Sequence, residues 1–234
     1  MISSVRSLSN FLKIKTVTNG MSLNNQNCHQ LIECGLNEIE ISLDGSSSSE
    51  SEEVRIKSNT EKIVQNILQL IEVKNSKQSN LDIYVSSTQF LRSKSDVTDP
   101  KKLIAQTPQW LINLFGNNVK YKSHLAQKWP HMNIGDQFEL ATAKGDDKNY
   151  CDHPINTITI RANGDIVPCC YDLTSQMVMG NIMNDTIFDI FNGPKYSDLR
   201  KSVLRKEYIK ACNVVRPHIY LIKSALPINK KTMY

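Results

Sequence analysis

The sequence predicts an α/β protein: an incomplete parallel (β/α) partial barrel or open sheet, followed by a small module with a cysteine-bearing β-hairpin and a helix. Short runs with alternating apolar residues are interspersed with longer segments whose apolar residues have helical spacing, an order typical of a parallel sheet covered by helices. Four of the six cysteines follow residue 150, so the second part has its own character. We therefore expect the barrel-like part over residues 1–148 and the cysteine module with a basic tail over 149–234.

Four strands are expected in the first part. Residues 14–17 form a short β-rich run that the turn signal Thr18-Asn19-Gly20 ends. Residues 38–43 alternate polar and apolar side chains up to Asp44-Gly45, which indicates a half-buried strand. The third and fourth strands are expected at residues 81–85 and 119–125.

Helices are expected between these strands. One begins at about Asn24 and ends before Gly35, and a capping box over residues 58–61 opens a longer one. Asp99 and Pro100 open a further helix, which Thr107 and Pro108 restart and Gly116 ends. The serine-rich, acidic run at residues 46–53 has no periodicity and is expected to be a mobile surface loop.

The module begins with a hairpin signal. Asn163-Gly164 lies between residues 157–161 and 165–168, and this dipeptide favours a type I′ turn with Ile158, Ile160 and Val167 packing on its strands. Cys151 precedes the first strand and Cys169 follows the second, so their sulfurs should meet at the open end of the hairpin. Two thiolates there make half a metal site. The alternative is two buried structural cysteines, since cysteine packs as a small hydrophobic residue.

Composition bounds the class of protein. The chain has 234 residues, 40% of them hydrophobic, and a formal charge of +5. No apolar run approaches the roughly 18 residues of a membrane span, and no secretory signal is visible, so we expect a cytoplasmic protein that is not in a membrane. Six cysteines then suit metal chemistry better than disulfides. Basic residues predominate beyond Lys195, but without interleaved aromatics nucleic-acid binding is not favoured, and the oligomeric state is left open.

The spacing of Cys151, Gly164 and Cys169, with twelve and then four intervening residues, resembles the opening of the SPASM domain, a C-terminal extension of many radical S-adenosylmethionine (radical SAM) enzymes. In that family such cysteines hold an auxiliary four-iron, four-sulfur cluster, which fits the preference of thiolates for iron–sulfur centres. Further segments match the family in order: Pro168-Cys-Cys-Tyr-Asp172, Met179-Gly-Asn-Ile182, Ile187-Phe-Asp-Ile-Phe-Asn192 and Tyr196-Ser-Asp-Leu-Arg200.

The first part resembles the middle and later strands of a radical SAM partial barrel, through Thr18-Asn19-Gly20 and Ile41-Ser-Leu-Asp-Gly45. The resemblance implies that Ser42 and Asp44 lie by the ribose of S-adenosylmethionine, with Arg55 near the same pocket and Asn19 at the same edge of the sheet. Hydroxyl and carboxylate groups are good partners for ribose hydroxyls. The alternative is that Ser42 and Asp44 merely begin a turn.

Two departures from the family stand beside these matches. The CxxxCxxC loop that holds the radical-generating cluster is missing, so the chain resembles a protein truncated inside the barrel, and Cys28 and Cys34 are expected to be ordinary buried cysteines. At the other end Cys212 lies where the family has a CxxC pair, but Val215 occupies the partner position. The implied cluster ligands are Cys151, Cys169 and Cys212, with Cys170, His153 or His218 as candidates for the fourth.

The resemblance implies a lineage that cleaves S-adenosylmethionine reductively and uses the radical to modify a substrate, often a peptide or protein. Because the CxxxCxxC loop is missing, we expect no radical generation by this chain alone. The alternative is a non-catalytic fragment that binds a metal ion, iron–sulfur or zinc, and engages a peptide or another partner. His124, Trp129 and His131 lie close together in sequence but lack partner residues at ligand spacing, so they are expected to be loop and core residues.

Overall fold

The computed structural model describes residues 1–55, 57–94, 104–129, 134, 138–142, 151–207 and 219–223. The described residues divide into two compact units. The first contains those up to Arg92 and those in 104–126, and the second contains most of those from Gln127 to Ile222. The predicted mixed α/β class is confirmed. The helix expected at Asp99 and Pro100 lies outside the described residues.

The first unit is built on a four-stranded sheet in the order β1-β2-β3-β4. All three strand pairs are parallel, which explains why each strand is followed by a helical connection. The register places Ser42 beside Ser86 and Thr88 beside His124, so the carboxyl ends of neighbouring strands lie at one edge. The bounds are β1 Lys15–Thr18, β2 Glu38–Ser42, β3 Asp82–Gln89 and β4 Lys120–Leu125.

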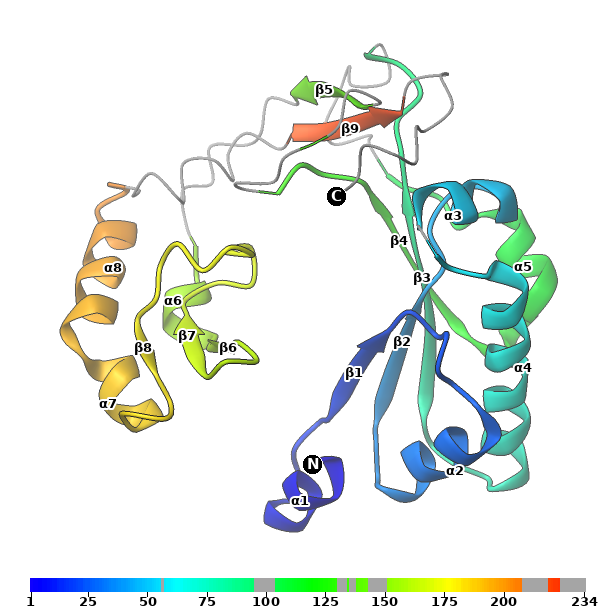
Figure 1. Cartoon of the computed structure of the whole chain (residues 1–234), viewed down its shortest axis with the longest axis horizontal. Coiled ribbons are helices and arrows are strands. Elements are labelled where there is room, and N and C mark those ends of the chain that lie inside the picture. The colour runs from blue at the N-terminus through cyan, green and yellow to red at the C-terminus, as the bar shows by residue number, and fades with distance from the viewer. Residues whose placement is uncertain are drawn as a thin grey trace. The chain divides into compact units, whose positions relative to one another are not determined.

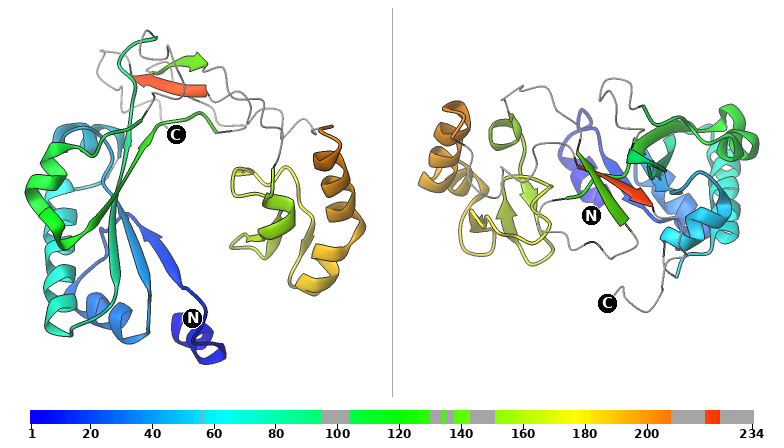
Figure 2. Two further views of the ribbon diagram at one scale, coloured as in Figure 1. Left: turned by 180° about the vertical axis from the view of Figure 1, so that it is seen from behind. Right: turned by 90° about the horizontal axis from the view of Figure 1, so that it is seen from above.

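Helices α2 (Asn25–Glu33), α4 (Thr60–Ser76) and α5 (Gln109–Phe115) cover one face of this sheet, drawn in blue, cyan and green in Figures 1 and 2. A 3₁₀ turn, Gly116–Asn118, follows α5. The core lies between the sheet and the helices, where full burial of each aliphatic side chain contributes roughly 1.5–3 kcal/mol. Its fully buried members include Ile39, Ile41, Leu43, Ile63, Ile67, Leu70, Val85 and Leu111.

Helix α1 (Ile2–Leu8) precedes β1 and was not expected from the sequence. Its Arg6 ties it to the loop between α2 and β2, because the guanidinium donates to the Gly35 carbonyl at 2.8 Å and also to the Asn37 side chain. Arg6 thus gives a polar anchor to a helix with no buried residue of its own.

The mobile loop expected at residues 46–53 was wrong, because helix α3 (Ser48–Val54) occupies most of this run. Ser47 caps the helix by accepting from the Glu50 backbone N–H. The Glu50 side chain turns inward, where its Oε2 accepts from the backbone N–H and the hydroxyl of Ser46 at 2.8 and 2.6 Å. Capping and a buried carboxylate, rather than apolar periodicity, define this helix.

The expected capping box also differs in detail. Helix α4 begins after Asn59, whose side chain accepts from the Lys62 backbone N–H at 2.8 Å, one residue later than the sequence suggested. Ser58 instead donates its hydroxyl to the Arg55 carbonyl at 2.7 Å. Asparagine is as good an N-cap as serine, so the neighbouring residue took the role.

A charged cluster lies on the sheet face opposite Ile39 and Ile41. Lys122 donates to Glu38 at 3.0 Å and to Glu40 at 2.9 Å, and Lys15 also contacts both carboxylates. The hydrogen bond from Lys122 is the largest cause that holds the pKa of Glu38 at about 2, against the opposing effect of burial. Because this is below the ordinary value of about 4.5, the ionised Glu38 stabilises the fold above that pH.

We therefore expect Glu38→Gln to lower the free energy of unfolding by about 2–3 kcal/mol at pH 7. The difference from wild type should shrink to less than half at pH 3, because the stabilisation is lost as the pH falls from 4.5 toward 2. Urea unfolding followed by circular dichroism at both pH values measures it. Glu33→Gln is the control, since its pair with Lys77 is exposed, and it should behave as wild type. A pH-independent effect of Glu38→Gln would contradict the assignment.

The second unit contains a three-stranded antiparallel sheet in the order β6-β7-β8. Its core comprises Ile166, Ile190 and Tyr196, while Ile158 and Ile160 are largely exposed, so the expectation that both pack was wrong. Instead of one helix ending near residue 200 there are two, because Gly193 separates them. The elements are α6 His153–Asn156, β6 Thr159–Ile160, β7 Asp165–Val167, β8 Gly180–Asn181, α7 Ile187–Asn192 and α8 Pro194–Leu204. Two unpredicted strands, β5 Phe138–Thr142 and β9 Ile219–Lys223, form a separate two-stranded sheet.

The turn between β6 and β7 is not the predicted type I′ turn. Only Gly164 has a positive φ, at +86°, whereas type I′ would require one at Asn163 as well. The Gly164 N–H donates to the Arg161 carbonyl, and the Arg161 N–H donates to the Asp165 carbonyl. This is the three-residue loop in which glycine provides the left-handed position after an ordinary turn.

In the part of the chain that the structure describes, no helix combines the length and the apolar character that crossing a bilayer would need.

Candidate metal centre

Two adjacent cysteines follow strand β7. The strand ends at Val167, which is fully buried, and Pro168 leads directly to Cys169 and Cys170. Cys169 then begins a turn, because its carbonyl accepts from the Asp172 N–H at 3.1 Å and its sulfur accepts from the Tyr171 N–H at 3.4 Å. Both thiols are therefore presented from a turn fixed to the core strand.

Asp172 holds the far side of this turn. Its carboxylate is buried and accepts from the backbone N–H groups of Gln176 and Met177, each at 2.8 Å. The Asp172 carbonyl also accepts from the guanidinium of Arg161 in the β6–β7 turn. These bonds fix the backbone on the C-terminal side of Cys169 and Cys170.

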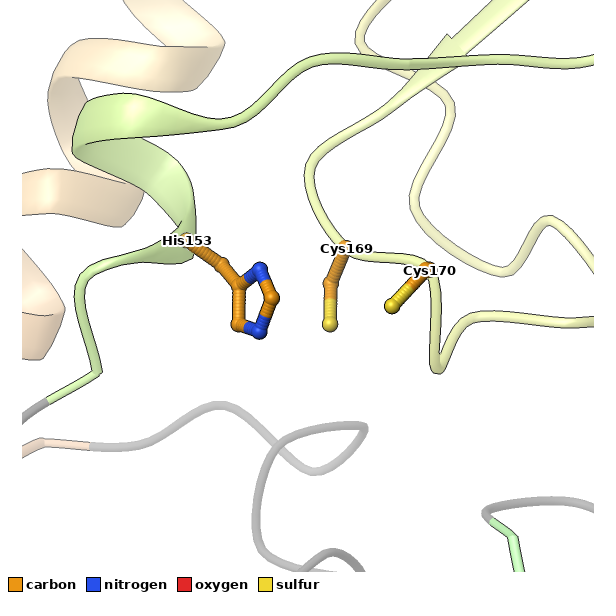
Figure 3. Close-up of side chains that lie close together, drawn as sticks. All are labelled: His153, Cys169 and Cys170. Carbon is orange, nitrogen blue, oxygen red and sulfur yellow. The ribbon is translucent and has the colours of Figure 1, made fainter. Parts of the chain in front are cut away.

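The third member of the group is His153, at the start of the short helix α6. One ligand atom from each of His153, Cys169 and Cys170 lies within 4.8 Å of the others. Figure 3 shows the imidazole beside the Cys169 sulfur, with the Cys170 side chain on the other side of Cys169. Residues 15 or more apart in the sequence are thus brought together by the β6–β7 hairpin.

The donor set fits a transition metal. Thiolate and imidazole are ligands of zinc, iron and iron–sulfur centres. A tetrahedral ion bound at about 2.3 Å to sulfur and about 2.0 Å to nitrogen holds its donors roughly 3.5–3.8 Å apart, so small side-chain movements would close this group around one ion. In addition, His153 Nδ1 is buried and has no hydrogen-bond partner among the described residues, so a polar atom within the group needs one.

Aromatic side chains line one side of the group. The ring of Tyr171 lies 4.8 Å from that of Trp129 and 6.3 Å, edge-on, from that of His153, measured between centroids. Burial is the largest cause that raises the pKa of the Tyr171 hydroxyl, and the nearby Cys170 and Cys169 add to it. Such a wall limits the access of water to the thiols. Trp129, expected to be a loop or core residue, belongs to it.

The remaining cysteines divide clearly. Cys151 is half-buried and lies two residues before His153, outside the group of three that the described residues form. Cys28 is fully buried in the core of the first unit, where burial raises its pKa, and Cys34 donates to the Leu31 carbonyl at 3.2 Å. Both behave as the expected ordinary cysteines. Cys212, His131 and His218 lie outside the described residues.

The residues expected at the cofactor edge of the sheet lie at the ends of β1 and β2. Arg55 Nε donates to Asp44 Oδ2 at 2.7 Å, and Asp44 Oδ1 accepts from the Thr88 N–H at 2.9 Å, so both carboxylate oxygens have protein partners. Asn19 accepts from the Met21 N–H at 3.1 Å. These bonds are those of turn-forming residues, while the hydroxyl of Ser42 has one long contact, 3.5 Å from the Ser86 hydroxyl.

Comparison with known proteins places the metal centre in a family. Residues 151–214 match the family model of the SPASM domain, an iron–sulfur cluster-binding domain. A 70-residue stretch is 33% identical to the S-adenosyl-L-methionine-dependent 2-deoxy-scyllo-inosamine dehydrogenase of Niallia circulans and covers 28% of each chain. The resemblance to the SPASM domain in the sequence is thereby confirmed.

Solved structures are also similar to this chain. SuiB of Streptococcus suis has 12% sequence identity and a TM-score of 0.49, over 81% of this chain and 51% of that one. The enzyme anSMEcpe with bound AdoMet has 11% identity and a TM-score of 0.45, over 79% of this chain and 55% of that one. The chain thus matches about a quarter of the length of the curated relative and about half of these two chains.

Proposed function

We propose that this chain, whose residues 151–214 form a SPASM domain, serves as the cluster-binding part of a radical SAM/SPASM protein. One observation carries the proposal: within the segment that matches the family, the ligand atoms of Cys169, Cys170 and His153 lie within 4.8 Å of one another. Thiolates are the usual ligands of iron–sulfur clusters, so residues and family point to the same cofactor.

In this proposal Cys169 and Cys170 supply thiolates from the turn after β7, and Cys151 and Cys212 are the further candidates. When bound, an iron–sulfur cluster supplies one-electron chemistry. The chain's own contribution is to fix the sulfurs through the Asp172 turn and to limit water through Tyr171 and Trp129.

We propose a second role for the first unit, as the later strands of a radical SAM partial barrel within residues 1–148. Ligands of parallel sheets bind at the carboxyl ends of the strands, where Ser42, Asp44, Asn19 and Arg55 lie. Because both Asp44 oxygens already have partners, Ser42 is the residue most available to a ribose hydroxyl. A peptide or protein remains the proposed class of substrate.

The expected result is that the chain binds S-adenosylmethionine but forms no 5′-deoxyadenosine, because the CxxxCxxC loop is missing from its sequence. Ser42→Ala should weaken binding roughly fivefold, the value of one hydrogen bond. Equilibrium dialysis measures binding, and chromatography after anaerobic reduction measures cleavage. Ser58→Ala, whose hydroxyl bonds within its own loop, is the control. Formation of 5′-deoxyadenosine would reject the non-catalytic part of the proposal, and equal binding by both variants would reject the role of Ser42.

A second candidate function is a site for a single zinc or iron ion that engages a peptide or partner without radical chemistry. The short separations in the group of His153, Cys169 and Cys170 favour it, since they suit the coordination sphere of one tetrahedral ion. Bound zinc without sulfide would support this candidate over the iron–sulfur cluster.

A further inference from the structure

His153 is held firmly at the entrance of helix α6. Its carbonyl accepts from the Thr157 N–H at 3.0 Å, and the next residue, Pro154, is buried. The Pro154 carbonyl accepts from Arg200 Nε at 2.8 Å, which ties α6 to α8. The backbone that carries the imidazole is therefore fixed from two sides, as a metal ligand requires.

The imidazole is also oriented toward the sulfurs. Its edge-on contact with Tyr171 places the ring against the turn that carries Cys169 and Cys170 (Figure 3). Its Nδ1 is buried and has no hydrogen-bond partner among the described residues. Buried polar atoms are nearly always satisfied, so a histidine serving only to pack against Tyr171 would leave this nitrogen unexplained.

We infer that His153 is a ligand of the metal centre together with Cys169 and Cys170, which gives the centre mixed nitrogen and sulfur ligation. The inference rests on the proposed function only in assuming that a metal binds at this group. Neutral imidazole in place of a thiolate removes one negative charge from the centre, and histidine ligation of iron–sulfur centres raises their reduction potential. Ligation also gives the ring nitrogen its missing partner.

The test compares wild type with His153→Ala and His153→Cys. His29→Gln is the control, because His29 lies on α2 in the first unit. In the first experiment, each protein is reconstituted anaerobically with iron and sulfide, reduced, and studied by pulsed electron paramagnetic resonance with ¹⁵N-histidine labelling. We expect a directly coupled histidine nitrogen in wild type and His29→Gln and none in the two His153 variants. Absence of the coupling in reconstituted wild type, or its persistence in His153→Ala, would overturn the inference.

The second experiment titrates the metal-free proteins with Co²⁺ alone and follows the sulfur-to-cobalt absorption. We expect His153→Ala to weaken binding at least 100-fold, more than the loss of a supporting residue around a metal, and His153→Cys to restore most of it. Equal binding by His153→Ala, or no restoration by cysteine in a folded protein, would reject ligation. Cobalt binding without iron–sulfur assembly would reject the cluster and leave the ligand assignment standing. Failure of wild type to bind in both experiments would reject both.

Discussion

Replacement of Cys169 by alanine should reduce the iron bound per chain after anaerobic reconstitution to background. Cys169 lies between His153 and Cys170 in the group, so its loss removes the central donor and leaves two ligands too few for a stable site. We expect the loss of affinity to exceed the 10–100-fold that substitutions around a metal site cost. Iron analysis and the visible absorption of the reconstituted protein measure it.

Cys34→Ala is the matched control for this variant. Cys34 is also a half-buried cysteine, but it lies in the first unit and donates to the Leu31 carbonyl. It should retain the iron content of wild type. Far-ultraviolet circular dichroism separates loss of ligand from loss of fold in both variants. Wild-type iron content in a folded Cys169→Ala protein would contradict the proposed centre.

Replacement of Gly20 by alanine should destabilise the first unit by about 3 kcal/mol, the sum of backbone strain and overpacking. Gly20 has a φ of +75°, which other residues rarely adopt. An added Cβ would also lie 2.8 Å from Ile41 Cγ2 and 2.9 Å from Ile63 Cγ2, both in the core. The turn cannot easily shift, because Asn66 Nδ2 donates to the Gly20 carbonyl at 2.9 Å.

Gly116→Ala separates the two contributions. Gly116 also has a positive φ, +52°, but no atom lies within 4 Å of an added Cβ, so only the strain of about 1 kcal/mol should remain. Urea unfolding followed by Trp110 fluorescence in a Trp129→Phe background reports on the first unit, because the two tryptophans lie in different units. Equal effects of the two substitutions would contradict the packing around Gly20.

The sheet of the first unit could be predicted because its signals are local. Alternation in residues 38–43 and the turn residues after it are sufficient to place β2, and Asn24 and Gly35 delimit the helix before it. Helix α3 was missed because it depends on the Ser47 cap and on the inward turn of Glu50 toward Ser46, which a run of serines and glutamates does not reveal.

The metal centre was predicted only in part. Spacing pointed to Cys151 and Cys169 as neighbours, whereas the structure groups Cys169 with Cys170 and His153. That grouping depends on where helix α6 meets the turn after β7, a long-range contact that the sequence pattern does not encode. The one available signal was a histidine two residues after the first cysteine of the motif.

The most direct test of the central claim is to measure iron and acid-labile sulfide per chain after anaerobic reconstitution of the wild-type protein. We expect about four irons and about four sulfides per chain, the composition of one [4Fe–4S] cluster. One ion per chain without sulfide, whether zinc or iron, would contradict the iron–sulfur assignment and leave the single-ion site of His153, Cys169 and Cys170 as the function of the module.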